Sequence, residues 1–199
     1  MAAPARQLAL GDSYTVGEGV AADASWPAQL RRRLGDEGIA IAPPRIVAVT
    51  GWTTDELAAG MDAAALAPAW ELVTLQIGVN DQYRGRPVDA CRQAFADLLA
   101  RAVALAGGDA ARVVVVSIPD WGVTRFAAGR DRTRIAAELD GYNALAATLA
   151  ARAGAAFVDI TGISRAHPAL VTDDGLHPDA AQYALWAAAI APAARAALR

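Results

Sequence analysis

The amino-acid sequence predicts an α/β fold with a five-stranded parallel sheet that helices cover on both faces. Five short apolar runs, each bounded by turn residues, are typical of strands, and segments of helical periodicity separate them. The runs are mostly apolar and do not alternate strictly with polar residues, which indicates strands buried on both faces. Since 199 residues is close to the usual size of one domain, we expect residues 1–199 to form a single domain.

The predicted strands are the β-branched and leucine-rich runs of the chain. In order they are Gln7–Leu10, Ile46–Val49, Leu72–Ile77, Val113–Ile118 and Ala156–Ile160. Each is short enough for a strand and too short for an independent helix.

Capping residues indicate where the first two helices begin and end. A helix is expected to follow Ser25 as its N-cap and to close by Gly38. Thr53 and Glu56 have the spacing of a capping box, in which each side chain satisfies an unpaired backbone donor of the other. We expect this second helix to end at Gly60, because glycine favours helix ends.

Three longer helices follow from apolar residues at helical spacing. One extends from Pro87 to Gly107, and another carries an apolar stripe from Ile135 until Gly154. The last begins at Pro178 and Asp179, where proline and a negative charge both suit a helix N-terminus, and runs toward the end of the chain.

Composition excludes several classes of function. All 18 basic residues are arginine, so the lysines of P-loop nucleotide-binding proteins and of pyridoxal enzymes are missing. Cys91 is the only cysteine and there are two histidines, so neither a disulfide framework nor a Cys/His zinc site is expected. We expect no cofactor and no metal.

Charge and hydropathy favour a small-molecule substrate. The net charge is -3 with both signs scattered, which favours neither nucleic acid nor an anionic membrane surface. No apolar run is long enough to span a bilayer. Residues 1–5 are too few for a secretion signal, so we expect a cytoplasmic protein unless a leader was removed. The oligomeric state is not indicated by the sequence.

Polar residues and glycine follow the first three predicted strands, at the edge where open α/β sheets place their sites. Ser13, in Gly11-Asp12-Ser13, lies at a strand-to-helix turn and is a candidate nucleophile. Gly51 allows its backbone N–H to approach a ligand closely, and the Asn80 amide offers a further donor. Together they predict an oxyanion hole, the set of donors that stabilises a tetrahedral intermediate.

A histidine with a nearby carboxylate stands near the end of the chain. Asp174 precedes His177 by three residues across a turn, a spacing that lets the carboxylate reach the imidazole and fix its tautomer. Asp173 fits this spacing less well. The other histidine, His167, has no carboxylate within a turn and is interpreted as a surface or packing residue. The sequence therefore predicts a Ser13–His177–Asp174 triad.

These motifs, Gly11-Asp12-Ser13, Gly51, Gly78-x-Asn80-Asp81 and Asp174-x-x-His177, resemble the four blocks of the SGNH (GDSL) hydrolase family and span almost the whole chain. The resemblance implies a three-layer α/β/α sandwich of flavodoxin-like strand order 2-1-3-4-5. It also implies a serine ester hydrolase that works through an acyl-enzyme, with the oxyanion held by the Ser13 N–H, the Gly51 N–H and the Asn80 side chain. Within the family, the short chain and the Ser25-Trp26-Pro27 stretch are similar to the lysophospholipase/thioesterase-like branch.

Substrate identity stays open at this point. Trp52, Tyr83 and Trp121 follow the second, third and fourth strands, as does Phe126, and are predicted to line an acyl pocket. The same triad serves carboxylesters, lysophospholipids, thioesters and acetylated sugars. A non-catalytic acyl or carbohydrate binding module and a dinucleotide-dependent oxidoreductase are the alternatives from other classes.

Overall fold

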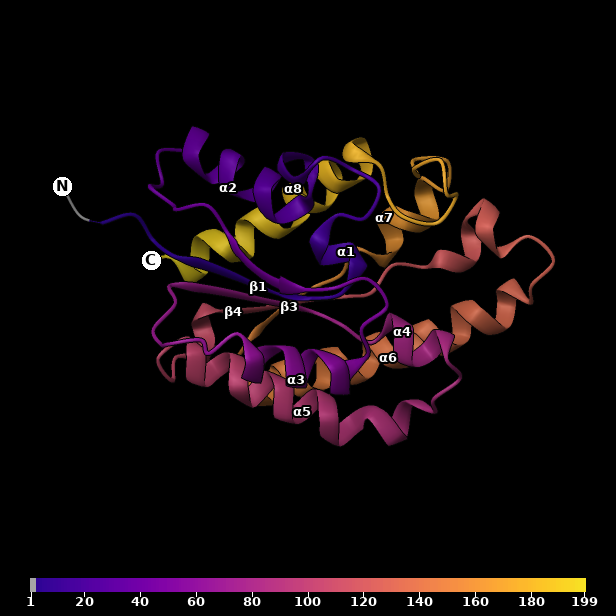
Figure 1. Cartoon of the computed structure of the whole chain (residues 1–199), viewed down its shortest axis with the longest axis horizontal. Coiled ribbons are helices and arrows are strands. Elements are labelled where there is room, and N and C mark those ends of the chain that lie inside the picture. Colours follow the sequence, from indigo (N-terminus) through magenta and orange to yellow (C-terminus); the bar gives the residue numbers. More distant parts are fainter. Residues whose placement is uncertain (1–2) are drawn as a thin grey trace.

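The computed structural model describes residues 3–199, so residues 1 and 2 of the short stretch considered as a leader lie outside the described residues. Within this range five parallel strands form one sheet of order β2-β1-β3-β4-β5, with helices on both faces (Figure 1). The strands are β1 (Gln7–Gly11), β2 (Arg45–Ala48), β3 (Leu72–Gln76), β4 (Val113–Val116) and β5 (Ala156–Val158). The predicted fold class and strand order are confirmed.

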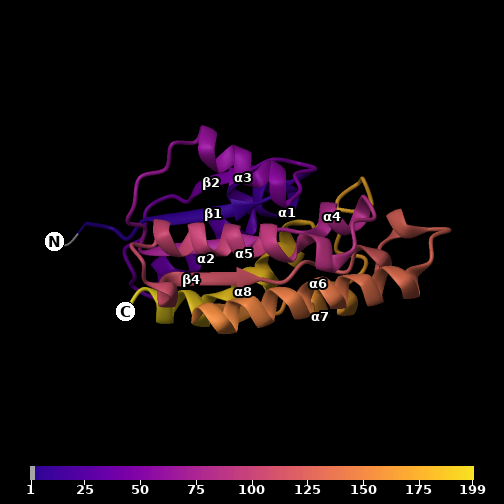
Figure 2. The ribbon, with the colours of Figure 1, turned by 90° about the horizontal axis from the view of Figure 1, so that it is seen from below.

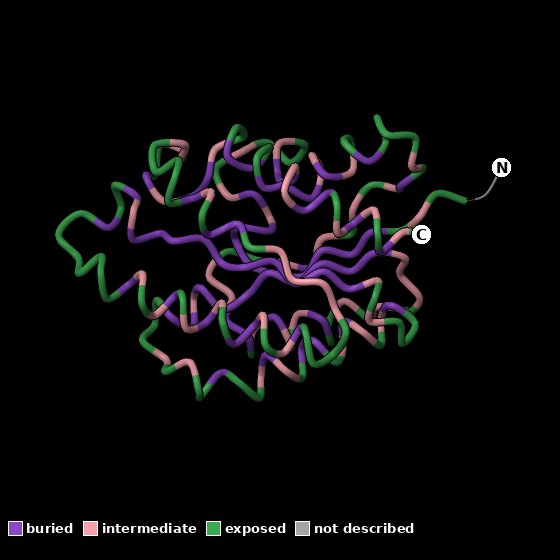
Figure 3. Tube along the Cα trace, turned by 180° about the vertical axis from the view of Figure 1, so that it is seen from behind, coloured by how far each residue is buried: buried purple, intermediate pink, exposed green. Residues whose placement is uncertain are grey.

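The two faces of the sheet carry different helices. One face holds α2 (Trp26–Asp36) and α8 (Ala180–Ala197), and the other holds α3 (Thr54–Ala63), α5 (Val88–Leu105) and α6 (Arg132–Ala153), which lie side by side (Figures 1 and 2). The strands β1, β3 and β4 are buried between these layers, the edge strands β2 and β5 are only partly buried, and the outer helix faces are exposed (Figure 3). None of the helices in residues 3–199 is both long and apolar enough to cross a membrane.

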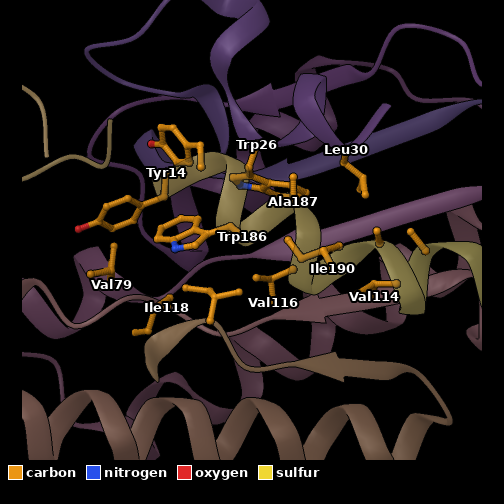
Figure 4. Packing of buried hydrophobic residues seen from close by; sticks show 14 of the residues in the cluster. Tyr14, Trp26, Leu30, Val79, Val114, Val116, Ile118, Trp186, Ala187 and Ile190 are labelled. Carbon is orange, nitrogen blue, oxygen red and sulfur yellow. The ribbon is translucent and has the colours of Figure 1, made fainter. Parts of the chain in front are cut away.

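Large apolar side chains join α2 and α8 to the sheet. Trp26 and Leu30 of α2 and Trp186 and Ile190 of α8 are all fully buried in one hydrophobic cluster with Val114 of β4 (Figure 4). Full burial of each such side chain contributes roughly 1.5–3 kcal/mol to folding. This packing fixes the sheet and the two helices from which the loops at the carboxyl ends of the strands extend.

Most predicted helix ends are confirmed by hydrogen bonds. The carboxylate of Glu56 accepts the Thr53 N–H at 2.8 Å, as the capping box requires. Asp179 caps α8 by accepting the Gln182 N–H at 2.9 Å, and Gly154 ends α6 in the left-handed conformation that glycine adopts without strain.

One predicted cap is correct in position only, and one predicted helix end is wrong. Ser25 is the N-cap residue of α2, but its hydroxyl donates to the carbonyl of Ala22 at 2.9 Å and makes no bond to the helix. Gly60 does not end α3, which continues to Ala63. The indole of Trp52 occupies the space that a Cβ of Gly60 would need, so this glycine is set by close packing.

Of the three short helices after the strands, only the one at the strand-to-helix turn of Ser13 was expected. They are α1 (Ser13–Val16), α4 (Val79–Tyr83) and α7 (Thr161–Ala166), each too brief to show periodicity. They begin where β1, β3 and β5 end, and the predicted ends at Ile77, Ile118 and Ile160 lie beyond the observed strands. The chain leaves the sheet there and forms the loops that hold the candidate site.

Candidate active site

Ser13 is held at the carboxyl end of β1 by a tight turn into α1. The buried Asp12 carboxylate caps this helix by accepting the Tyr14 N–H at 3.0 Å. A Cβ at Gly11 would lie 2.6 Å from the carbonyl oxygen of Gln76, so only glycine fits between β1 and β3 there. The Ser13 side chain is 4% exposed and is thereby fixed at the start of the helix.

Asp12 is an unusual carboxyl because it is wholly buried. Its Oδ2 atom has no hydrogen-bond partner in the described part of the chain. Burial raises the pKa of Asp12 to about 7; the Tyr14 N–H lowers it and the charge of Asp81 raises it further. This geometry gives Asp12 a turn-stabilising role, and the carboxyl is protonated at mildly acidic pH.

His177 and Asp174 are in contact through the predicted pair of atoms. Nδ1 of His177 lies 2.6 Å from Oδ2 of Asp174. The other carboxylate oxygen accepts the N–H groups of Leu176 at 2.7 Å and His177 at 3.0 Å. Partial burial raises the pKa of Asp174, but these bonds outweigh it and lower the pKa to about 2. Asp174 is therefore an anion at any working pH, and it orients the imidazole.

Two residues outside the predicted triad hold this loop in place. The buried ring of Tyr14 packs against the imidazole of His177, with centroids 5.6 Å apart. The guanidinium of Arg125 donates to the carbonyl oxygens of Thr172 at 2.8 Å and Asp173 at 2.7 Å. Both contacts join segments far apart in the sequence, so no local pattern predicts them.

Asn80 and Gly51 are joined through the backbone of the loop after β2. The Asn80 amide donates one hydrogen to the Trp52 carbonyl at 2.9 Å, which orients the amide and leaves its second hydrogen available. Gly51 has φ +85°, and its carbonyl accepts Arg84 at 2.7 Å. Within residues 3–199 the N–H groups of Ser13 and Gly51 donate to no protein acceptor.

Asp81 fixes the position of the loop after β2. Its buried carboxylate accepts the N–H and the hydroxyl of Thr54, at 2.9 and 3.1 Å, and Arg86 at 2.9 Å. The carboxylate thus fixes the start of α3 relative to α4, and with it the positions of Gly51 and Asn80. The motif Gly78-x-Asn80-Asp81 contained this residue, but its role depends on partners that the sequence does not reveal.

A cavity of about 170 Å³ collects most of the predicted site residues. It is lined by Ser13, Tyr14, Val79, Asn80, Tyr83, Trp121, Phe126, Leu176 and His177. The aromatic part of this lining, Tyr83, Trp121 and Phe126, forms a connected group of rings with centroids 5.4–6.3 Å apart.

Three predicted site residues do not line this cavity. One is Asp174, which contacts the Nδ1 atom of the cavity residue His177. Gly51 lies beside the cavity, attached through its neighbour Trp52 to Asn80. The Trp52 ring faces away and packs on Gly60, because that glycine leaves space for it in α3. The prediction that Trp52 lines the acyl pocket therefore disagrees with the structure, which assigns it to packing. His167 is exposed and also lies outside the cavity lining.

The GDSL-like lipase/acylhydrolase family model matches residues 9–185 of the chain, a range that includes every predicted triad and oxyanion residue. The chain belongs to this family. As a GDSL-like acylhydrolase it is a hydrolase acting on ester bonds. The match runs from β1 into α8, so the fold and the family assignment cover the same part of the chain.

Solved structures are similar to this GDSL-like hydrolase in fold. TesA has 22% identity and a TM-score of 0.75, with 97% of this chain and 99% of that chain covered. The lipase/acylhydrolase from Enterococcus faecalis has 20% identity and a TM-score of 0.72, with 94% of each chain covered. A variant of Axe2, an acetyl-xylooligosaccharide esterase from Geobacillus Stearmophilus, has 20% identity and a TM-score of 0.74, with 96% and 94% covered. None of the curated proteins compared with the chain matches it by sequence.

Proposed function

We propose that this GDSL-like hydrolase is a serine carboxylesterase, similar to lysophospholipases, that cleaves acyl esters through an acyl-enzyme on Ser13. The observation that carries the proposal is that Ser13, His177 and Asn80 line one cavity while Asp174 bonds the inner nitrogen of His177. A nucleophile, a base and an oxyanion donor that face one space are the parts that acyl transfer needs.

The proton path follows from the Asp174 contact. Because the Asp174 carboxylate accepts at Nδ1, the proton of neutral His177 resides there and Nε2 is free to act as the base. Nε2 takes the Ser13 proton as Oγ attacks the ester carbonyl, and Asp174 stabilises the imidazolium. The imidazolium then protonates the leaving alcohol, and water repeats the cycle on the acyl-enzyme.

The developing oxyanion is stabilised by three donors. They are the N–H groups of Ser13 and Gly51, which have no acceptor within residues 3–199, and the second amide hydrogen of Asn80. Arg84 and Asp81 hold the peptide and the helix that carry two of these donors. Donors fixed before the reaction need no reorganisation as charge develops.

The aromatic part of the lining is the substrate wall. Trp121 is buried and fixed by the hydrogen bond from its Nε1 to Gln82 at 2.8 Å, whereas Tyr83 is 47% and Phe126 36% exposed. An acyl chain lying along these rings removes apolar surface from water at about 25 cal/mol per Å². We assign Tyr83, Trp121 and Phe126 to the wall, and Trp52 to support of Asn80.

A carbohydrate acetylesterase is the second candidate. The cavity of about 170 Å³ suits a small acyl group, and the exposed rings of Tyr83 and Phe126 at its edge offer faces on which a sugar can stack. The fold likeness to an acetyl-xylooligosaccharide esterase is compatible with this candidate. A thioesterase would use the same residues.

The proposal is tested with 4-nitrophenyl esters from acetyl to palmitoyl. We expect Ser13→Ala and His177→Ala to abolish hydrolysis, while His167→Ala, the matched change at the exposed histidine, retains it. Circular dichroism and the unfolding midpoint check that each variant is folded. Turnover that survives in folded Ser13→Ala would refute the assignment, and an optimum at acetyl that extends to acetylated xylo-oligosaccharides would favour the second candidate.

A further inference from the structure

Arg130 lies over the aromatic wall of the cavity. Its guanidinium carbon is 5.2 Å from the ring centroid of Tyr83 and 5.3 Å from those of Trp121 and Phe126. Its Nη2 atom donates to the Tyr83 hydroxyl at 3.2 Å. Contacts with three ring systems hold the guanidinium in position, because the face of an aromatic ring attracts a cation.

The charge of Arg130 has no protein counterion. Among residues 3–199 no carboxylate oxygen lies within 4.0 Å of its guanidinium, whereas Arg84, Arg86 and Arg134 are each paired with a carboxylate. Its neighbour in the sequence, Asp131, is occupied as the N-cap of α6. Arg130 is therefore an exposed cation, with most of its five donors free, beside a cavity that contains the candidate nucleophile.

We propose that Arg130 is a specificity-determining residue that binds a carboxylate or phosphate group of the ester substrate. This inference rests on the proposed function, because it places the anion on a molecule whose scissile ester is at Ser13. The rings of Tyr83 and Phe126 lie between the cavity and the guanidinium, so the anion is separated from the ester by an apolar segment that covers these rings. Planar guanidinium groups bind carboxylate and phosphate oxygens in pairs, which suits this role.

The rival explanation is that Arg130 only clamps the rings. A clamp would affect charged and neutral substrates alike, whereas an anion site changes the ratio between them. The decisive quantity is therefore the ratio of kcat/KM for an anionic ester to that for its neutral counterpart of equal length.

The experiment compares mono-4-nitrophenyl adipate with 4-nitrophenyl hexanoate, so that the anion is on the acyl side. A second pair, the hexanoate esters of 4-hydroxybenzoate and phenol, carries it on the alcohol side. Arg130→Gln is expected to lower the anionic-to-neutral ratio about tenfold in one of the pairs, the value of one charge-assisted hydrogen bond. Arg152→Gln removes the same charge at the other end of α6 and should leave the ratio unchanged.

Binding separates this inference from the proposed function. Calorimetric titration of Ser13→Ala, with and without Arg130→Gln, with monomethyl adipate and methyl hexanoate measures the anion preference without turnover. Arg130-dependent preference in this titration, together with a wild type that hydrolyses none of the esters, would support an anion site at Arg130 and refute the proposed function. Ser13-dependent hydrolysis with the same ratio in wild type and Arg130→Gln for both pairs would overturn the inference and leave the function standing.

Discussion

Replacing Gly60 by alanine tests how the oxyanion loop is supported. In an exposed helix interior this change stabilises a protein by about 0.5–1 kcal/mol, because glycine is a poor helix former. In α3 an added Cβ would lie 2.5 Å from Cζ3 and 3.0 Å from Cζ2 of Trp52, and closest of all to Cη2. Real Cβ atoms do not approach other atoms so closely, so the indole must move.

The net effect on stability follows from these opposed contributions. Overpacking at a well-filled position costs about 1–3 kcal/mol, which exceeds the helix gain. We expect Gly60→Ala to lower the free energy of unfolding by about 1 kcal/mol, or the Tm by roughly 2–4 °C in a protein of this size.

A kinetic effect accompanies the loss of stability. The carbonyl of Trp52 accepts the Asn80 amide, so displacement of the indole shifts an oxyanion donor. Small misplacements of catalytic groups are costly, and we expect turnover of a 4-nitrophenyl ester to fall by about tenfold. Thermal and urea unfolding give the first quantity, and steady-state kinetics on folded protein gives the second.

Gly141 in the middle of α6 is the matched control. A Cβ there meets only Val88 Cγ1, at 4.0 Å, which is ordinary contact. Gly141→Ala should therefore raise stability by about 0.5–1 kcal/mol. If Gly60→Ala gains as much as Gly141→Ala and keeps full turnover, the argument from Trp52 is refuted.

Three further predictions concern the candidate site. Burial raises the pKa of Asp12 to about 7, so the stability that protonated Asp12 contributes is complete below pH 4 and is lost as pH rises through 7. Asp12→Asn should therefore flatten the profile of Tm against pH in this window. An unchanged slope would contradict the assignment of Asp12 as a buried acid. Asn80→Ala should lower turnover by about 10²–10³-fold in a folded protein, and unchanged turnover would remove Asn80 from the oxyanion hole. Arg125→Met removes the two hydrogen bonds to the loop before His177 and should lower turnover by about tenfold. The chain-length preference of the esters is a second readout. Wild-type kinetics in this variant would show that the loop keeps its position without Arg125.

Local patterns in the sequence were enough to predict the strands and the main helices. Mostly apolar runs such as Leu72–Ile77 predicted strands within a residue or two, because a strand buried on both faces favours apolar residues on each of them. Capping predictions such as Thr53 with Glu56 succeeded since each involves residues within one helical turn. The contact of Asp174 with His177 could be predicted for the same reason, because the two residues lie three positions apart in one loop.

Tertiary contacts decided what single positions do. Gly60 has the sequence signature of a helix end, but an indole from the preceding loop makes it a packing position. Trp52 and Trp121 follow strands in the same way, yet one ring turns toward α3 and the other toward the cavity. The Trp52 ring packs on Gly60 in the following helix, whereas the Trp121 ring is held by Gln82, 39 residues earlier in the chain.

The sequence by itself therefore determined the fold class, the strand order implied by its family resemblance and the residues offered for acyl transfer. Only the tertiary structure decided which side chains line the cavity, how Arg84 and Arg125 brace its loops, and that Arg130 lies over the aromatic wall without a counterion. The physical reason is range. Hydrophobic periodicity and capping act between near neighbours in the chain, whereas packing and ion pairing join residues that only the folded chain brings together.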